Sequence, residues 1–436
     1  MKAKTNGTLL SAALISLSGL VLAQSQPPRP PGPGTQPPPA GQRPPPPQQG
    51  MRPAQRTQTP QTTQADMGNP LQPRFGDPLP GITTAERAAF VNGRNEFLNR
   101  ENPAGGLGPI FNRDSCVACH GGPAPGGGSP INVTRFGTLT NGVFDPLTAL
   151  GGSLLQERSI TPQSREVVPP QALIRARRNS TPLFGLGLIE AIPDVTILAG
   201  VRTTPVDGVK GKASMVIDVT SGQARVGRFG WKAQQATLLA FSGDAYVNEM
   251  GITNRFFPTE NAPNGDTAKL AAADQVADPE DTIDPANGKA DIDRSADFMR
   301  LLAPPPPVTL SASAAQGRNV FNQVNCHLCH TPTMMSGDSP VAALRNKAVN
   351  LYSDLLLHDM GTLGDRIVQG DASGTEMKTP PLWGLRASAP YLHDGRAPNV
   401  DAAIRAHDGE AKGSRDRYNA LTPAQKQQLL DFLNSI

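Results

Sequence analysis

The four cysteines of this 436-residue chain all belong to two short motifs of the same form. The motifs read CVACH at residues 116–120 and CHLCH at residues 326–330. A Cys-x-x-Cys turn places two sulfurs on one side, where they can bond to the two vinyl groups of a haem, and the next histidine then lies under the iron. The sequence therefore predicts two covalently attached c-type haems. The predicted attachment residues are Cys116, Cys119, Cys326 and Cys329, with His120 and His330 as iron ligands.

Two other interpretations of the motifs are weaker. A zinc site usually has its second cysteine pair about 15–20 residues after the first, whereas Cys119 and Cys326 are far apart in the sequence. Two redox-active disulfides would not require a histidine after each pair. His327 lies between the linked cysteines of the second motif, where the tight turn points its side chain away from the iron. We expect it at the edge of the haem.

The remaining histidines all follow the second motif. They are His358, His393 and His407, and no histidine lies between His120 and His327. The second haem therefore has candidates for its sixth ligand. The first haem should be open or bound to water, unless Met250 or a C-terminal histidine reaches it.

A helix precedes each motif and must position it. Residues 83–101 fit a helix with Thr83 as its N-cap, and Glu86, three residues later, completes a capping box. A similar segment precedes the second motif, and both contain Gly-Arg-Asn-x-Phe, at residues 93–97 and 317–321. This weak internal repeat predicts two domains that each begin with a helix and then present a haem-binding motif.

Other patterns predict the rest of the fold. Residues 421–436 fit a terminal helix with Thr422 as its cap and Pro423 at the first helical position, packed on the first helix of its domain. Residues 214–230 alternate apolar and polar side chains around Ser-Gly, which is typical of a hairpin. Because glycine (44) and proline (45) are abundant, we expect a mainly α fold with much irregular structure, a small β-hairpin insertion and two cytochrome c-like haem domains.

The N-terminal part of the chain should lie outside these domains. Residues 1–23 have the charged start, apolar stretch and small terminal residues of a signal peptide. Residues 24–66 are rich in proline, glutamine and threonine, so we expect a disordered linker. We place the N-terminal haem domain with insertions at 67–302. The C-terminal cytochrome c-like domain follows at 303–436, where a proline-rich connector begins.

The predicted signal peptide implies export to the periplasm or the cell surface. Its apolar stretch is too short and too rich in serine and glycine for a membrane span. The net charge of +3 comes from the basic residues of the signal peptide and the linker. Charge therefore gives no case for nucleic-acid binding.

Several segments resemble the di-haem oxidoreductase family, sometimes labelled thiol oxidoreductases, which is related to the bacterial di-haem cytochrome c peroxidases. These segments are GLGPIFN before the first motif, GRFGWKA in mid-chain, and LHDMG and PPLWGLR after the second motif. Residues 379–411 also resemble the C-terminal segment of the peroxidases. The likeness extends from about residue 70 to the C-terminus. A thiol oxidase activity has no residue to support it, since no cysteine remains outside the motifs.

The resemblance implies roles for individual residues. The peroxidases have a methionine that binds the electron-transfer haem, and His407 occupies the matching position, which makes it the predicted sixth ligand of the second haem. A histidine in place of methionine should lower the potential of that haem. The loop YVNEMGITN resembles the peroxidase loop with the acid–base glutamate, which implies a catalytic role for Glu249. Gln235 could replace their accompanying glutamine, and Met250 is expected to pack in the interior.

We therefore expect an exported di-haem c-type cytochrome that acts as a peroxidase-like oxidoreductase. Peroxide or another small redox substrate would react at the first haem. The second haem, with two histidine ligands, would exchange electrons with a partner cytochrome or another electron-transfer protein. The alternative is a pure electron-transfer cytochrome without substrate chemistry. Trp231 and Trp383 are the only tryptophans that could relay electrons between the haems, and a structural calcium ion is a further candidate cofactor without assigned residues.

Overall fold

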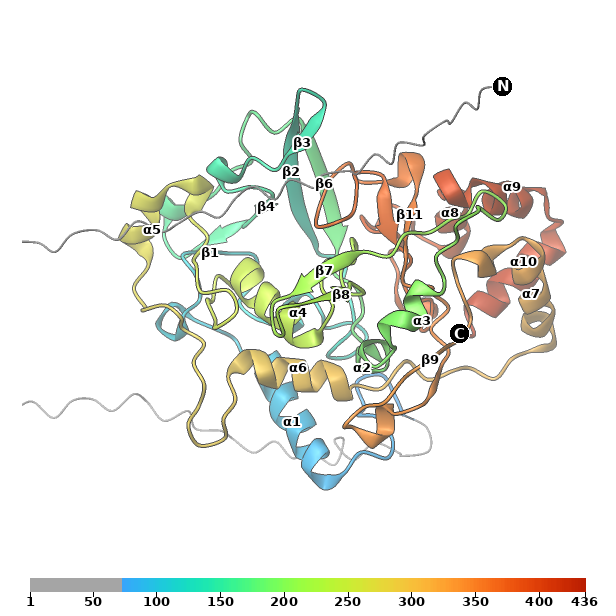
Figure 1. Ribbon diagram of the computed structural model, residues 1–436, viewed down its shortest axis with the longest axis horizontal. Helices are drawn as coiled ribbons and strands as arrows, with labels where there is room; N and C mark the ends of the chain where they lie inside the picture. The colour runs from blue at the N-terminus through green and yellow to red at the C-terminus, as the bar shows by residue number, and fades with distance from the viewer. Residues whose placement is uncertain (1–72) are drawn as a thin grey trace, which may run out of the picture. The chain divides into compact units, whose positions relative to one another are not determined.

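Figure 1 shows the computed structural model of the chain, which describes residues 73–436. The predicted signal peptide and linker, residues 1–66, lie outside the described residues. By their internal contacts, residues 73–436 belong to one compact unit. The domain boundary predicted at residue 303 falls inside this unit and stays a prediction.

Short helices and short strands alternate with long irregular segments. The α-helices are α1 (Thr84–Leu98), α2 (Leu186–Glu190), α3 (Asp194–Leu198), α4 (Leu238–Ala245), α5 (Thr267–Ala273), α6 (Asp291–Leu301), α7 (Ala312–Gln323), α8 (Val400–Arg405), α9 (Lys412–Ala420) and α10 (Pro423–Leu433). The strands are β1 (Ile110–Phe111), β2 (Asn132–Thr140), β3 (Val143–Asp145), β4 (Leu154–Leu155), β5 (Arg158–Ser159), β6 (Ile174–Asn179), β7 (Met215–Asp218), β8 (Gln223–Val226), β9 (Met334–Met335), β10 (Ala348–Val349), β11 (Leu357–Asp359) and β12 (Glu376–Lys378).

The helix signals in the sequence are confirmed at both ends of the described chain. The α1 capping box is present, because the Glu86 amide donates to Thr83 Oγ1 and the Thr83 amide donates to Glu86 Oε2. Helix α10 begins at Pro423 with Thr422 as its cap. It buries Leu429 and other apolar residues against α7. The terminal helix therefore packs on the first helix of the predicted C-terminal domain, as expected.

The sheets depart from the predicted fold class. Strands β7 and β8 form the predicted hairpin, with Met215 opposite Val226. A second, larger antiparallel sheet was missed: β2 pairs with β3, β4 and β6. Strand β2 is half-buried along most of its length and shows no clean alternation of buried and exposed positions. Its sequence therefore lacks the period-two pattern from which a strand is predicted.

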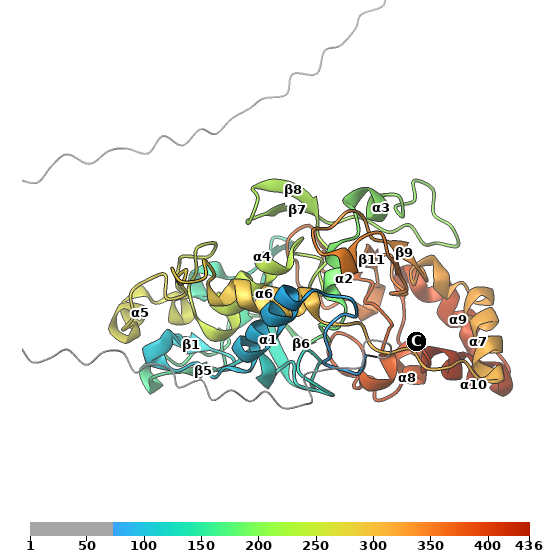
Figure 2. The same cartoon turned by 90° about the horizontal axis from the view of Figure 1, so that it is seen from below.

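Two pairs of helices cross at the glycines of the repeated Gly-Arg-Asn-x-Phe segment (Figures 1 and 2). Helix α1 packs on α6, where a Cβ at Gly93 would meet the Arg294 carbonyl oxygen at 2.2 Å. Helix α7 packs on α10, where a Cβ at Gly317 would meet the Gln428 carbonyl oxygen at 1.8 Å. Only glycine allows the two backbones to come so close.

The phenylalanine of each repeat then packs on a phenylalanine of the partner helix. The ring centroids of Phe97 and Phe298 are 4.8 Å apart, and those of Phe321 and Phe432 are 5.5 Å apart. All four rings are buried. The sequence repeat therefore corresponds to two similar helix crossings, each close to one Cys-x-x-Cys-His motif.

A buried ion-pair network connects β6 to two distant segments. Asp365 contacts Arg178 of β6 at 2.7 Å and Lys232 at 3.0 Å, and all three side chains are almost fully buried. Burial lowers the pKa of Lys232 to about 8 despite the nearby Asp365 carboxylate. Two buried cations share one carboxylate here, so these segments are held in fixed positions.

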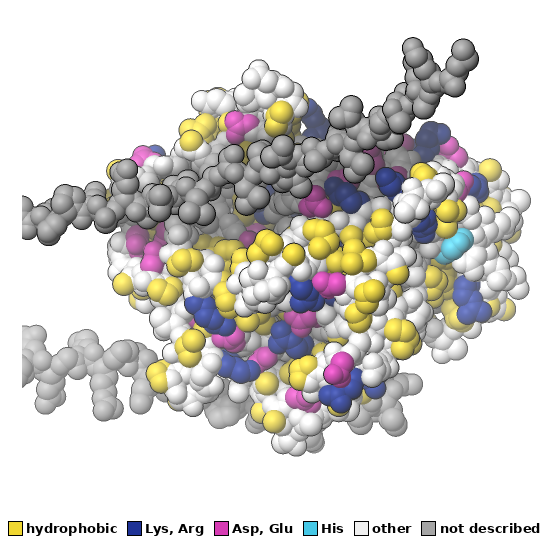
Figure 3. All heavy atoms as spheres, in the orientation of Figure 1, with side chains coloured by type: hydrophobic (Ala, Val, Ile, Leu, Met, Phe, Trp, Pro, Cys, Tyr) yellow, Lys and Arg dark blue, Asp and Glu magenta, His cyan; other side chains and the backbone are white. Residues whose placement is uncertain are grey.

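No helix of residues 73–436 combines the length and the apolarity needed to cross a bilayer. On the face shown in Figure 3, basic and acidic side chains are interspersed with apolar ones.

The helix crossings can be tested with three glycine-to-alanine variants. Gly93→Ala and Gly317→Ala should each lower the free energy of unfolding by about 1–3 kcal/mol, because the added methyl group meets backbone that cannot yield. Gly413→Ala is the matched control. It lies in α9, where the nearest atom is the flexible end of Arg417 at 3.2 Å, and it should be neutral or stabilising. Equal effects of all three in denaturant unfolding would contradict the crossing geometry.

Candidate functional site

The two Cys-x-x-Cys-His motifs form turns of the same shape. Each begins with a 3₁₀ turn, Cys116–Ala118 in one and Cys326–Leu328 in the other. The His120 amide donates to the Cys116 carbonyl at 3.0 Å, and the His330 amide donates to the Cys326 carbonyl at 2.9 Å. The repeat in sequence is therefore also a repeat in backbone structure.

Each motif lies in the wall of its own cavity. The first pocket is lined by Cys116, Cys119 and His120 and has a volume of about 180 Å³. The second pocket is lined by Cys326, Cys329 and His330 and has a volume of about 190 Å³. The similar size and walls indicate two sites for the same kind of group.

The four thiols are poorly suited to redox exchange or to zinc binding. None of them forms a disulfide. Burial raises the pKa of Cys116 and of Cys326 to about 12, and that of Cys119 to about 11. Disulfide exchange and metal binding both require a thiolate, which an electropositive environment must stabilise. The environment of these cysteines disfavours it.

The histidine of each motif is fixed by a backbone carbonyl. Nδ1–H of His120 donates to the Gly127 carbonyl at 3.1 Å, and Nδ1–H of His330 donates to the Tyr352 carbonyl at 3.0 Å. A carbonyl accepts only, so the proton lies on Nδ1 and leaves Nε2 free as a ligand atom. Burial lowers the pKa of both imidazoles, to about 4 for His330. Both rings are therefore neutral, as metal binding requires.

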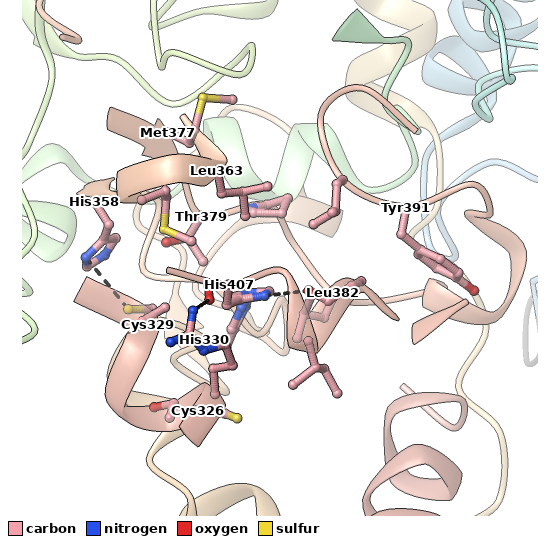
Figure 4. A pocket seen from close by; sticks show the side chains of 18 of the residues that line it. Cys326, Cys329, His330, His358, Leu363, Met377, Thr379, Leu382, Tyr391 and His407 are labelled. Atoms are coloured by element: carbon pink, nitrogen blue, oxygen red, sulfur yellow. Dashed lines mark hydrogen bonds between the residues drawn. The ribbon is translucent and has the colours of Figure 1, made fainter. Parts of the chain in front are cut away.

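The second pocket places His407 close to His330 (Figure 4). His407 follows the C-terminal end of α8, and its Nδ1–H donates to the Ala403 carbonyl at 2.8 Å. The Arg415 guanidinium donates to the His407 carbonyl and fixes the backbone at this position. The ring centroids of His330 and His407 are 6.5 Å apart.

This separation suits a metal ion between the two rings. An imidazole bound through Nε2 has its ring centre about 3 Å from the metal, so two rings on opposite sides of one iron lie roughly 6 Å apart. The cavity walls around the rings are largely apolar, with Leu382, Leu385 and Val400 among them. The second pocket therefore fits a haem with two histidine ligands.

The other histidines take different positions. His358 also lines the second pocket, but its two nitrogens contact Asp354 at 2.9 Å and Glu410 at 2.7 Å. Burial opposes its protonation, but these carboxylates, together with contact to Cys329, raise its pKa to about 12, and both ring nitrogens are engaged by carboxylates. His393 lines the second pocket and is buried. His327 is not among the residues that line it.

The first pocket contains a half-buried carboxylate, Glu249, and no second histidine among the described residues that line it. Glu249 lies in a π-helical turn, Tyr246–Met250, that continues α4. Such turns are rare and occur mostly at functional sites. The Asn112 side-chain amide donates to Glu249 Oε2 at 2.8 Å. Burial nevertheless raises the pKa of Glu249, against the opposing effect of Arg135.

A second half-buried carboxylate, Asp244, lines the same pocket one helical turn before Glu249. Desolvation also raises its pKa, while the charge of Arg135 and hydrogen bonds from Asn248 and Gln235 oppose the shift. Gln235, the predicted partner of Glu249, is not among the lining residues, whereas its neighbour Gln234 is. The structure thus brings Gln235 to Asp244, and Glu249 itself has Asn112 as its partner.

Arg135 is the clearest sign that the first pocket fits a haem. It belongs to β2, lines the pocket, and its buried Nε has no hydrogen-bond partner within the described chain. A guanidinium group is the preferred partner of a carboxylate, and a haem carries two propionate carboxylates. Sequence reasoning missed Arg135 together with Asp244. Neither residue has a neighbouring pattern that marks it, whereas Asn112 ends the GLGPIFN segment.

Trp231 is common to both pockets. It also lines a third cavity of about 430 Å³, which shares Asn179 with the first pocket and Lys378 with the second. Its indole N–H donates to the Asn179 carbonyl at 2.9 Å, and its ring lies 6.2 Å from that of His393. Trp383 lines only the third cavity. Of the two tryptophans, Trp231 is therefore the one between the pockets.

Two like pockets, each with a free histidine nitrogen beside a Cys-x-x-Cys turn, define a protein with two sites for a metal-containing prosthetic group. A model of the family described as "Di-haem oxidoreductase, putative peroxidase" matches residues 164–436. The chain therefore belongs to the di-haem oxidoreductase family, as the resemblance implied. It is an oxidoreductase, and membership of this family implies haem cofactors. The matched residues include the second motif but not the first.

Solved structures of three other proteins show weaker similarity. Hydrazine synthase of Kuenenia stuttgartiensis is 14% identical, with a TM-score of 0.39, over 81% of this chain and 88% of its own. The diheme peroxidase BthA of Burkholderia thailandensis is 16% identical, with a TM-score of 0.32, over 80% and 85%. A MauG-like protein associated with microbial copper homeostasis is 15% identical, with a TM-score of 0.30, over 58% and 88%. At such low scores these structures add nothing to the assignment of the site. No curated protein matches the chain.

Proposed function

We propose that this chain is an exported di-haem c-type cytochrome with a peroxidase-like activity at the first pocket and an electron relay at the second. The difference between the pockets is the observation that carries the proposal. The second pocket has two histidine rings 6.5 Å apart. The first has one histidine, His120, and the half-buried carboxylate Glu249. In each pocket the two cysteines of the motif would hold the haem covalently.

A haem iron with a free coordination position supplies the redox chemistry that reduces peroxide. The chain's own contribution is proton transfer, because converting hydrogen peroxide to two waters consumes two electrons and two protons. Glu249 is the group placed to accept a proton from the incoming peroxide and to return it to the leaving oxygen. Its raised pKa suits this role, since an acid–base catalyst works best with a pKa near the working pH.

Asn112 and Arg135 hold Glu249 ready for this role. The Asn112 amide donates to the Glu249 carboxylate and so favours its charged form, and the positive charge of Arg135 acts in the same direction. Burial acts in the opposite direction. The balance between these effects keeps the carboxylate able to change its protonation state.

Trp231 is the proposed route for electrons between the two pockets. It lines both, and its hydrogen bond to the Asn179 carbonyl fixes its ring. The electrons would arrive at the second pocket from a partner cytochrome or another electron-transfer protein. The second haem, bound by His330 and His407, would have no free position for peroxide and so would serve only the relay.

The catalytic role of Glu249 is tested by Glu249→Gln. We expect peroxide-dependent oxidation of a reduced electron donor to slow by at least about 100-fold, with the absorption spectra of both haems unchanged.

Asn112→Ala should keep activity but shift its pH dependence. Wild-type activity should fall as the pH drops through the raised pKa of Glu249, and loss of the Asn112 hydrogen bond raises that pKa further. The acid limb should therefore move to higher pH. Full turnover by Glu249→Gln would contradict the assignment.

The relay role is tested by His407→Ala. Loss of this ligand should convert one haem from low-spin to high-spin, because histidine on both sides of the iron gives a strong ligand field. His393→Ala is the control, since His393 lines the same pocket and is buried there. In His393→Ala the second haem should stay low-spin, as in the wild type. Optical and magnetic spectra of the two oxidised variants would show the spin state of each haem and so test whether His407 is a ligand. Unchanged haem spectra in His407→Ala would show that His407 is not a ligand.

A further inference from the structure

A cluster of three carboxylates lies outside both pockets. Glu260, Asp278 and Glu280 each offer an oxygen, and these oxygens lie within 4.8 Å of one another. Glu260 is 8% exposed, Glu280 is half-buried and Asp278 is exposed. Within the described residues, no lysine or arginine forms an ion pair with any of the three. Like charges this close repel one another strongly unless a cation or a proton lies between them.

Glu260 is the unexplained member of the cluster. Both of its carboxylate oxygens are buried and have no hydrogen-bond donor among the described residues. A buried carboxylate normally accepts two or more hydrogen bonds, because leaving it without a partner costs several kilocalories per mole. Glu166 gives the contrast, since it is equally buried and accepts the backbone amides of Asn264 and Gln156. Glu260 therefore lacks the donors that its burial would require.

The surroundings supply further oxygen and hold the carboxylates in place. Thr253 is fully buried, and its hydroxyl contacts Asp278 Oδ1 at 2.8 Å and also Glu280. The Thr253 amide donates to Glu280 Oε2 at 2.7 Å. Glu280 is further confined by Gly106, where a Cβ would meet the Glu280 side chain at 2.6 Å. Asp278 and Glu280, from one irregular segment, thus both contact Thr253, and Glu260 comes from a second segment.

We propose that Glu260, Asp278 and Glu280 bind a calcium ion. Calcium takes six to eight oxygen ligands, mostly carboxylate, hydroxyl, carbonyl and water, in flexible geometry. Three carboxylates beside a hydroxyl match this preference, and the exposed side of Asp278 leaves room for waters. Magnesium demands a stricter octahedral arrangement and retains more of its water. A cluster drawn from two loop segments fits the larger ion better.

The burial of the cluster agrees with this assignment. Desolvation, together with the neighbouring acids, raises the pKa of Glu260 to about 9, and the pKa of Glu280 is raised as well. A bound cation would reverse both effects, since it stabilises the ionised carboxylates.

The calcium would stabilise the part of the chain that carries Glu249. Thr253 follows the π-helical turn closely, and the Gly108 amide donates to the Met250 carbonyl at 2.9 Å. The segments that bind the ion have no regular secondary structure of their own. An ion that links them would replace the hydrogen bonds of a helix or a sheet. The site stands independently of the proposed activity.

The test is calorimetric titration of the purified holo-protein with calcium chloride after treatment with a chelator. We expect one calcium ion to bind per chain, with magnesium chloride at least about tenfold weaker. Saturating calcium should raise the midpoint of thermal unfolding by about 3 °C. No binding, or equal binding of magnesium, would overturn the proposal, and no binding would mean that the carboxylates share a proton instead.

Two variants locate the ion. Glu260→Gln should weaken calcium binding at least about tenfold. Asp278→Asn should weaken calcium binding similarly. Because Asp278 is exposed, this substitution should not impair folding. Glu166→Gln is the matched buried control and should bind calcium as the wild type does. Wild-type affinity in both Glu260→Gln and Asp278→Asn would place the ion elsewhere and contradict the assignment.

Discussion

The close approach of two helix backbones, made twice, is the constraint on which both pockets depend. Gly93 lets α1 lie against α6, and Gly317 lets α7 lie against α10. Beside each crossing, one phenylalanine from each helix packs against the other. A Cys-x-x-Cys-His turn then follows α1 and α7 in the sequence. Because a haem adds no backbone hydrogen bonds, the protein must build the walls of its pocket from such packed helices and from fixed turns. The same local design therefore serves both halves of the chain.

The two pockets share their proximal side and differ on the opposite side. In both, a carbonyl fixes the motif histidine in the neutral form with Nε2 free. Across the second pocket, α8 ends so that His407 faces His330. Across the first, a π-helical turn and β2 bring Glu249 and Arg135 to the cavity. In the proposed function, this asymmetry would let the first haem react with substrate while the second would only carry electrons. Trp231, which lines both, connects the two functions.

Local patterns predicted the parts of this structure that depend on few neighbouring residues. The caps of α1 and α10, the β7–β8 hairpin and the two motifs could be read from short stretches, because capping and turn geometry are local. His407 was predicted only through resemblance to a family. Local patterns could not predict the sheet in which β2 pairs with β3, β4 and β6, nor the places of Arg135 and Asp244. These positions depend on contacts between segments far apart in sequence. The prediction of Gln235 shows the same limit, because the structure places its neighbour Gln234 in the wall of the first pocket.

The spin states of the two haems in the oxidised wild-type protein test the asymmetry most directly. Electron paramagnetic resonance distinguishes an iron with a free or water-bound position from one held by two histidines. We expect one high-spin signal, from the first pocket, and one low-spin signal, from the second. Cyanide should convert only the high-spin signal to low-spin. Two low-spin signals that cyanide leaves unchanged would contradict an open first haem and would favour a protein that only transfers electrons.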